Sequence, residues 1–123
     1  MFTKQDFLKF CASLDNTVID QPFKGDYVTT VARHADTRKW FAIVIERDGR
    51  SFVNLKINPL DAGFLYHSFK GIKPAYHMNK WHWISVIFDM DVPDDLICDL
   101  TMTSYFLTRK GKQNFSVIAR EDD

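Results

Sequence analysis

The densest group of chemically useful side chains lies between Tyr76 and Trp83. These eight residues combine aromatic rings with two histidines, one amide and one lysine. In one interpretation Tyr76 stacks on a base of a nucleic acid, while polar side chains contact the phosphates. Those contacts would come from His77, Asn79 and Lys80. In the other interpretation, histidine and asparagine side chains at a strand entrance hydrogen-bond to backbone groups and hold a turn.

Basic residues elsewhere in the chain could extend such a site. The net charge is zero, with 16 basic and 16 acidic residues, so the chain lacks the overall basic character typical of nucleic-acid-binding domains. The middle is nevertheless basic: residues 24–80 carry ten Lys or Arg against five acids, whereas residues 81–123 carry four against eight. If the pleat turns the basic side chains to one uncovered sheet face, they form a positive patch. Its members would be Arg33, Lys39, Lys56, Lys73 and Lys80, although solvated strand residues would give the same pattern.

The sequence contains no arrangement typical of a catalytic site. A nucleophile beside a base, or two opposed acids, is the usual requirement. Cys11 and Cys98 lie on predicted core faces, Ser104 lies inside a predicted helix, and no glycine-rich phosphate loop is present. His77 and His82 lack the nearby cysteines or paired carboxylates of a closed zinc site. We therefore expect a protein that is not an enzyme and that carries no metal or cofactor.

Three helices and four strands are expected to position these residues. Apolar residues at helical spacing predict helices over residues 3–14, 58–71 and 91–110. Helix-start signals precede all three, and glycines follow the second and third. Leu60, Phe64 and Leu65 form the expected core stripe of the second helix, with Phe69 as a further candidate. Runs of β-branched and aromatic residues predict strands over 28–33, 40–47, 51–57 and 81–88, with 115–118 as a further short strand or a surface tail.

The order of these elements predicts an α+β fold. Asp48-Gly49 is a typical two-residue turn, so the strands on either side of it form an antiparallel hairpin. We expect an antiparallel sheet of about five strands with helices on one face, and the other face partly open. The length of 123 residues suits one domain.

The location is predicted from the N-terminal residues, the apolar segments and the cysteines. The polar N-terminal residues, with Asp6 among them, are unlike a secretory signal, and no segment has the apolar length of a membrane span. Two cysteines in apolar patterns suit buried thiols in a reducing compartment. We expect a cytoplasmic protein without a membrane partner; the sequence predicts no oligomeric state.

The segment Pro74–Ile84 resembles the signature of a known family. Its Tyr-His-x-Asn-Lys-x-His-Trp pattern is similar to that of the MmcQ/YjbR family. Further similar motifs are Lys39-Trp40-Phe41, Leu55-Lys56 before Asn58-Pro59, and Ser104-Tyr105 in the last helix. The resemblance covers about residues 3–110 and leaves the tail 111–123 outside. It implies a double-wing or frataxin-like fold and a DNA-binding role.

Three functional hypotheses follow. The first is a small nucleic-acid-binding or regulatory module, with DNA as the expected partner, which would use Arg33, Lys39, Lys56, Lys73, Tyr76, His77, Asn79 and Lys80. The second is a module that binds a protein or small ligand through Tyr76, Trp81 and neighbouring apolar residues. The third is implied by the frataxin-like resemblance: iron binding by the acids between residues 89 and 99. The position of Asp94 and Asp95 at a helix start already explains those two charges.

Overall fold

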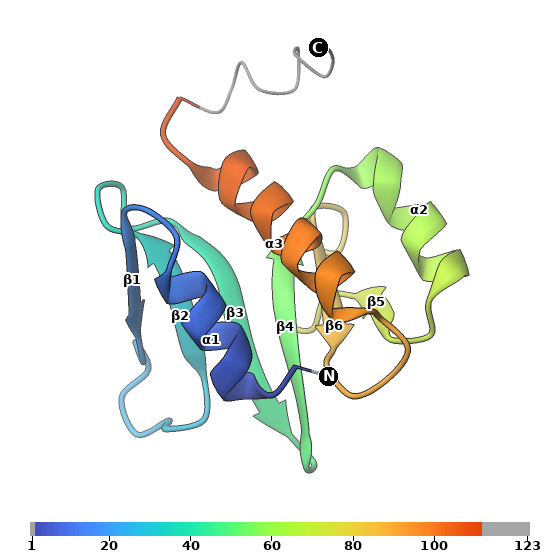
Figure 1. Ribbon diagram of the computed structural model, residues 1–123, viewed down its shortest axis with the longest axis horizontal. Coiled ribbons are helices and arrows are strands. Elements are labelled where there is room, and N and C mark those ends of the chain that lie inside the picture. The colour runs from blue at the N-terminus through green and yellow to red at the C-terminus, as the bar shows by residue number, and fades with distance from the viewer. Residues whose placement is uncertain (1, 112–123) are drawn as a thin grey trace.

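The computed structural model describes residues 2–111 (Figure 1). Within this range the chain forms three helices and one six-stranded sheet, and every neighbouring pair of strands is antiparallel. The strand order is β1-β2-β3-β4-β6-β5, so the predicted α+β fold is confirmed. The elements are α1 (Lys4–Ala12), β1 (Thr17–Asp20), β2 (Thr30–His34), β3 (Trp40–Arg47), β4 (Arg50–Lys56), α2 (Pro59–Ser68), β5 (Ile72–Pro74), β6 (Trp83–Ile87) and α3 (Asp94–Thr108).

Local sequence signals set the starts of the first two helices. The Thr3 hydroxyl accepts a hydrogen bond from the Asp6 amide at 3.1 Å, and the Asp6 carboxylate accepts one from the Thr3 amide at 3.2 Å. This capping box satisfies two amides that have no partner inside α1. At α2, the Asn58 side chain accepts from the Leu60 amide, and Pro59 occupies the first turn.

The β3–β4 hairpin forms as predicted. Asp48 and Gly49 both have positive φ, at 53° and 78°, which is the geometry that a two-residue turn of this type requires. The register pairs Ile43 with Asn54 and Ile45 with Phe52. These four residues therefore lie on the same face of the sheet.

The sheet has two edge strands that the sequence analysis did not predict. The prediction of about five strands left residues 17–19 as an irregular segment and residues 73–74 as a loop, but they belong to β1 and β5. Both strands are short and form by pairing with β2 and β6, so their own sequences carry a weak signal. The fourth predicted strand begins at Trp83 rather than Trp81, and the candidate strand 115–118 lies outside the described residues.

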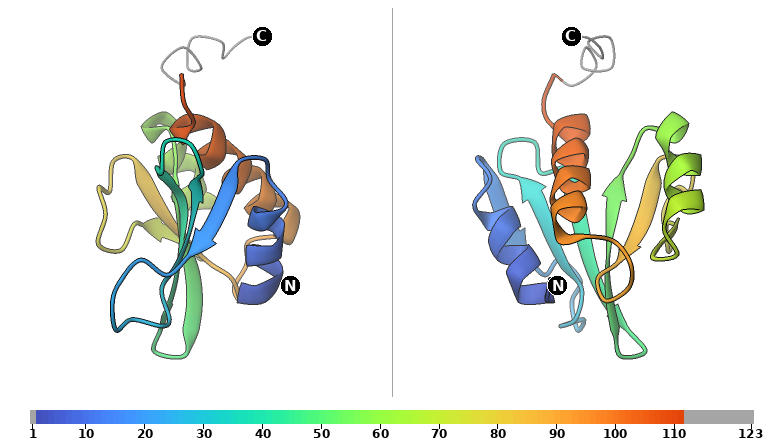
Figure 2. Two further views of the ribbon diagram at one scale, coloured as in Figure 1. Left: turned by 90° about the vertical axis from the view of Figure 1, so that its left-hand side faces the viewer. Right: turned by 45° about the vertical axis from the view of Figure 1, so that its right-hand side comes forward.

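One face of the sheet is covered by helices. Figure 2 shows α1 and α3 on one side of the sheet, and the segment 75–82 on the other side. Apolar residues from both layers form the core beneath α1 and α3, among them Phe7, Phe41, Leu55, Ile84 and Ile97. Ser104 joins α3 to the two central strands: its hydroxyl donates to the Phe41 carbonyl at 2.6 Å and accepts from the Lys56 amide at 2.8 Å. No helix of the described chain has both the length and the apolar character that crossing a membrane requires.

Candidate nucleic-acid interface

The open face of the sheet is built by the alternate residues that point away from α1 and α3. Register pairs place Ile43 of β3, Asn54 of β4, Ser85 of β6 and Lys73 of β5 in one row across this face. Two chain segments border the face: the loop 21–29 between β1 and β2, and the segment 75–82 between β5 and β6. The sequence elements thus create a shallow site between two connecting segments.

A buried polar network fixes the segment 75–82 to the sheet. The fully buried Asn54 donates from Nδ2 to the Tyr76 carbonyl at 2.9 Å, while its Oδ1 accepts from the Ser85 hydroxyl at 2.5 Å. The same Ser85 hydroxyl accepts from the Tyr76 amide at 3.0 Å. Because a buried amide without partners is costly, these three bonds stabilise one position of the Tyr76 backbone.

Tyr76 and His77 form a projecting edge that we call the Tyr76–His77 ridge. His77 has a positive φ of 59°, uncommon for a residue with a side chain, and its ring lies 4.0 Å from the Tyr76 ring between centroids. The Arg47 guanidinium lies over the Tyr76 ring at 4.8 Å and donates to the Tyr76 hydroxyl. Phe52 packs edge-to-face against the same ring at 5.8 Å. The Tyr76 ring is therefore held on several sides while part of it stays exposed.

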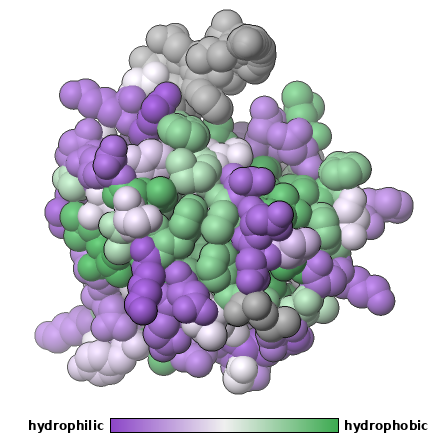
Figure 3. Space-filling view, in the orientation of Figure 1, coloured by the Kyte–Doolittle hydropathy of each residue, from purple (hydrophilic) through white to green (hydrophobic). Residues whose placement is uncertain are grey.

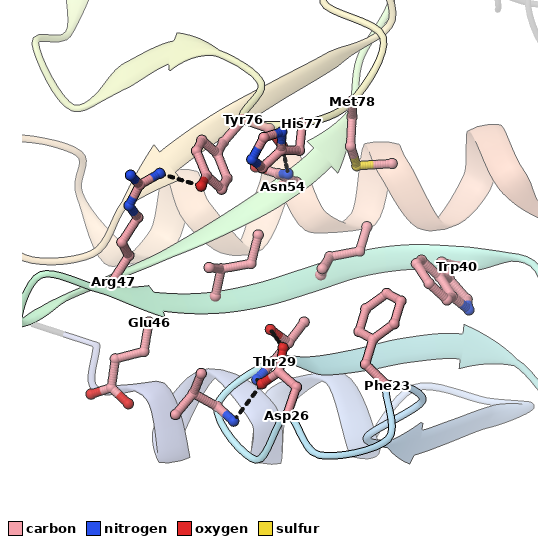
Figure 4. A pocket seen from close by; sticks show the side chains of 13 residues that line it. Phe23, Asp26, Thr29, Trp40, Glu46, Arg47, Asn54, Tyr76, His77 and Met78 are labelled. Carbon is pink, nitrogen blue, oxygen red and sulfur yellow. Dashed lines mark hydrogen bonds between the residues drawn. The ribbon is translucent and has the colours of Figure 1, made fainter.

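The first groove lies between the ridge and the loop 21–29, over β3 (Figure 4). Its volume is about 470 Å³, and Ile43 and Ile45 form its floor. Phe23 and Trp40, which pack edge-to-face at 5.7 Å, stand opposite Met78 and the ridge. We call it the apolar groove; its other lining residues are Asp26, Val28, Thr29, Glu46, Arg47, Asn54, Tyr76 and His77.

Asp26 braces the loop side of the apolar groove. Its carboxylate accepts hydrogen bonds from the Val28 and Thr29 amides, at 2.9 and 3.0 Å, and from the Thr29 hydroxyl at 2.7 Å. The Thr29 hydroxyl, followed by the Val28 amide, lowers the pKa of Asp26 because each bond favours the charged carboxylate. Asp26 therefore acts as a support for the loop.

The second groove lies on the other side of the ridge. It has a volume of about 400 Å³ and no acidic residue among those that line it. Lys73 of β5 and Lys80 of the segment 75–82 both line it, together with the ridge. We call it the basic groove; Phe52, Pro74, Ala75, Ser85 and Ile87 complete its lining.

The structure brings together four of the eight residues predicted to contact nucleic acid. Lys73, Tyr76, His77 and Lys80 line the basic groove, and two of them also line the apolar groove. Asn79 instead holds a turn: its side chain accepts from the Trp81 amide at 2.9 Å, and its carbonyl accepts from the His82 and Trp83 amides. For Asn79 the structural interpretation is the one that the geometry supports.

The other three predicted residues line neither groove. Arg33 forms an ion pair with Asp20 of the neighbouring strand, and little of its side chain is exposed. Lys39 is exposed in the turn between β2 and β3. Lys56 is half-buried at the end of β4, where its amide donates to Ser104. The sequence analysis in turn missed Arg47, Asn54 and Ser85; the polar Asn54 between the apolar Val53 and Leu55 was the available signal.

The cysteines and several acidic residues are accounted for by burial, hydrogen bonds or ion pairs. Burial raises the pKa of the Cys11 thiol to about 12, and burial followed by nearby aspartates raises that of Cys98. The Asp91 carboxylate accepts from the Lys70 and Gly71 amides at 2.8 Å each, and Asp89 pairs with Arg50. Among residues 2–111 no group of three or more His, Cys, Asp or Glu side chains is placed to hold a metal ion.

Comparison with known proteins identifies the family. The YjbR family model matches residues 12–107. YjbR of Escherichia coli K12, named as uncharacterized, is 31% identical over 103 residues, which are 84% of each chain. The uncharacterized protein YyaQ of Bacillus subtilis is 29% identical over 119 residues, covering 89% of this chain and all of YyaQ.

Solved structures agree with this relationship. A crystal structure of a Pseudomonas syringae protein has a TM-score of 0.82 at 30% identity and covers 88% of this chain and 100% of its own. A Deinococcus radiodurans protein has a TM-score of 0.76 at 31% identity, with coverage of 89% and 80%. The frataxin-like relationship finds no support in these matches, and the names assign no activity. The chain belongs to the YjbR family, as the resemblance of its Pro74–Ile84 segment predicted.

Proposed function

We propose that the protein is a binding module for single-stranded DNA, which lies along the Tyr76–His77 ridge. The observation that carries this proposal is the composition of the basic groove: two lysines share it with an aromatic ring and a histidine, and none of its lining residues is acidic. Proteins that bind single strands combine positive charge along the backbone with aromatic side chains on which bases stack. Both features occur here side by side.

The ridge separates surroundings that suit the two parts of a nucleotide. On one side, Lys73 and Lys80 provide ammonium groups for phosphates. On the other, Trp40, Phe23 and Met78 provide apolar surface for bases. A strand that follows the ridge would direct its bases into the apolar groove and its phosphates into the basic groove. A duplex keeps its bases stacked inside the helix and would use only the charges.

The charge of the site predicts a modest salt dependence. The overall charge is zero, so the attraction comes from the groove itself. If two lysines neutralise two phosphates of a single strand, the slope of log K against log salt is about −1.4. We expect weak binding that is clear at low salt and reduced at physiological salt.

Fluorescence anisotropy with a labelled single-stranded oligonucleotide tests this proposal. The Lys73→Ala/Lys80→Ala variant should lose affinity at low salt and show a salt slope near zero. Tyr76→Ala should weaken binding by about 5-fold to 150-fold, the range that corresponds to one stacked base. The matched control Lys9→Ala/Lys110→Ala removes the same charge from exposed positions outside both grooves and should retain wild-type affinity.

Two results would contradict single-strand binding. One is no binding to the oligonucleotide even at low salt. The other is an affinity that stays unchanged in the Lys73→Ala/Lys80→Ala variant. Equal affinity for duplex and single strand would leave the basic groove as a phosphate site but would exclude base stacking on the ridge.

A small apolar ligand is the second candidate, and the apolar groove favours it. Its volume of about 470 Å³ lies within the usual range of ligand sites, and most of its lining is apolar. Asn54 and Asp26, which line it, already use their polar atoms to support the surrounding backbone. Binding of such a ligand would change little with salt, which distinguishes it from DNA.

A further inference from the structure

The outer face of α2 carries large apolar side chains that the core does not use. Leu60 is 90% exposed and Phe64 73% exposed, although the sequence analysis expected both in the core stripe of this helix. Instead Ala62 and Leu65 are the buried residues of α2. Trp81, on the segment that faces α2 across a hollow, is 77% exposed. Figure 3 shows apolar surface in the region of α2, at the right of the view.

A helix that is apolar on both sides is normally covered on both sides. One side of α2 packs on the molecule through Ala62 and Leu65, whereas Leu60 and Phe64 meet solvent. Hollows flank the exposed side chains: one of about 540 Å³ between α2 and Trp81, and one of about 300 Å³ between α2 and Leu100 of α3. The surface thus carries both projecting apolar side chains and hollows whose lining is mostly apolar.

Gly63 lies between these projections. It is exposed in the middle of α2, and a Cβ added there would meet no atom within 4 Å. An exposed glycine in a helix interior makes the helix less stable than alanine would. Gly63 therefore does not contribute to the stability of α2 itself. Its lack of a side chain allows another helix to approach closely at this point, between Leu60 and Phe64.

The charges of α2 are arranged for an antiparallel partner of the same kind. Asp61 lies in the first turn, His67 in the last turn, and Lys70 just beyond the end. Two antiparallel copies of α2 would bring Asp61 of each near His67 and Lys70 of the other. Their helix dipoles would also point in opposite directions, which is the favourable arrangement. A twofold axis requires such a self-complementary surface, because each copy uses the same residues.

We infer that α2 is the contact surface for a second copy of this chain, in a symmetric dimer with the two α2 helices antiparallel. The ring of Phe64 from one copy packs over Gly63 of the other, and the flanking hollows receive Leu60. A stable dimer usually buries about 800 Å² on each partner, more than the face of a ten-residue helix provides. Trp81 and the exposed part of α3 beside Leu100 must therefore join the interface. This inference does not rest on the DNA-binding proposal, although Pro74 and Lys80 line both the hollow beside α2 and the basic groove.

Sedimentation velocity over a range of protein concentrations tests the dimer. The wild-type chain should pass from monomer to dimer as concentration rises, and Phe64→Glu should stay monomeric. Tyr27→Glu is the matched control, because Tyr27 is an equally exposed aromatic residue, 79%, on the loop 21–29. This variant should dimerise like the wild type. Circular dichroism should show both variants folded, since neither side chain belongs to the core.

A charge exchange tests the orientation of the two helices. Asp61→Lys and His67→Asp should each weaken the dimer, because each places like charges together across the twofold axis. Combined in one chain, the two changes restore opposite charges and should restore dimerisation. A wild-type chain that remains monomeric at all concentrations would overturn the inference. So would a dimer that persists in Phe64→Glu, or one that the combined charge exchange fails to restore.

Discussion

Asn54 shows how a single buried side chain can position an exposed one. Its amide holds the Tyr76 carbonyl and the Ser85 hydroxyl, and Ser85 in turn holds the Tyr76 amide. The Tyr76 ring, which contacts solvent and lines both grooves, therefore depends on a residue that solvent does not reach. Changes at Asn54 should affect stability and binding together.

Replacing Asn54 with alanine should remove the donor to the Tyr76 carbonyl and the acceptor of the Ser85 hydroxyl. We expect the free energy of unfolding to fall by about 1–3 kcal/mol, the usual cost of unsatisfied buried polar groups. Urea denaturation followed by fluorescence measures this change. Ser68→Ala, at an exposed position on α2, is the control and should change stability little. A variant as stable as the wild type would show that the network contributes nothing to the fold.

At the scale of residues, the sequence predicted the exposed side chains of the candidate site better than the buried residues that hold them in place. Lys73, Tyr76, His77 and Lys80 were found because they cluster along the chain. Asn54 and Ser85 lie 31 positions apart and meet only because β4 pairs with β6. The ion pair that occupies Arg33 likewise depends on β1, an edge strand that the sequence analysis did not predict.

The helices and strands show the same contrast: features set by neighbouring residues were predicted, whereas features set by packing between distant residues were not. The Asp48-Gly49 hairpin and the start of α1 depend on residues within one turn, and both were predicted correctly. The stripe of α2 was assigned from spacing alone, which cannot tell which apolar side of a helix faces the sheet. The structure turns Leu60 and Phe64 outward because Ala62 and Leu65 pack inward.

The junction between α2 and β5 is tightly packed against the segment that connects β6 to α3. A Cβ added at Gly71 would lie 3.0 Å from Asp91 Oδ1 and 3.1 Å from the Met90 Cβ. Gly71→Ala should therefore displace Asp91, which binds the Lys70 and Gly71 amides, and destabilise the protein by about 1–3 kcal/mol. Thermal unfolding measures the effect.

The same substitution at Gly63 should have the opposite effect on stability. It adds a methyl group in open space on a helix and should raise stability by about 0.5–1 kcal/mol in the monomer. Equal effects at the two glycines would contradict the role of close packing at Gly71.

For the molecule as a whole, a buried histidine couples stability to pH. His34 lies between the sheet and α3, where its Nε2 is 2.9 Å from the Thr108 hydroxyl oxygen and its ring contacts Tyr105. Because that hydroxyl donates to the Ser104 carbonyl, it accepts the hydrogen on Nε2. Burial is the main cause that lowers the pKa of His34 below its ordinary value of 6.5.

The direction of this pKa change predicts lower stability in mild acid. Below pH 6.5 the unfolded chain binds a proton at His34 that the folded chain resists, so the free energy of unfolding should fall as pH drops from 7.5 to 5.5. Asp6, Asp26, Asp36 and Asp91 have lowered pKa values and lose their contribution only nearer pH 4. Urea midpoints across this range should flatten in His34→Gln and stay pH-dependent in His67→Gln. A pH dependence that His34→Gln leaves unchanged would assign the effect to another group.

Strand β5 forms one edge of the sheet, where a strand from another molecule could pair with it. An exposed border strand can template the growth of intermolecular β-structure such as amyloid. β5 has only three residues, and its last, Pro74, has no amide hydrogen to donate. This border of the sheet therefore offers an incoming strand little backbone to pair with, and we expect little fibril growth to start beside the segment that carries Tyr76.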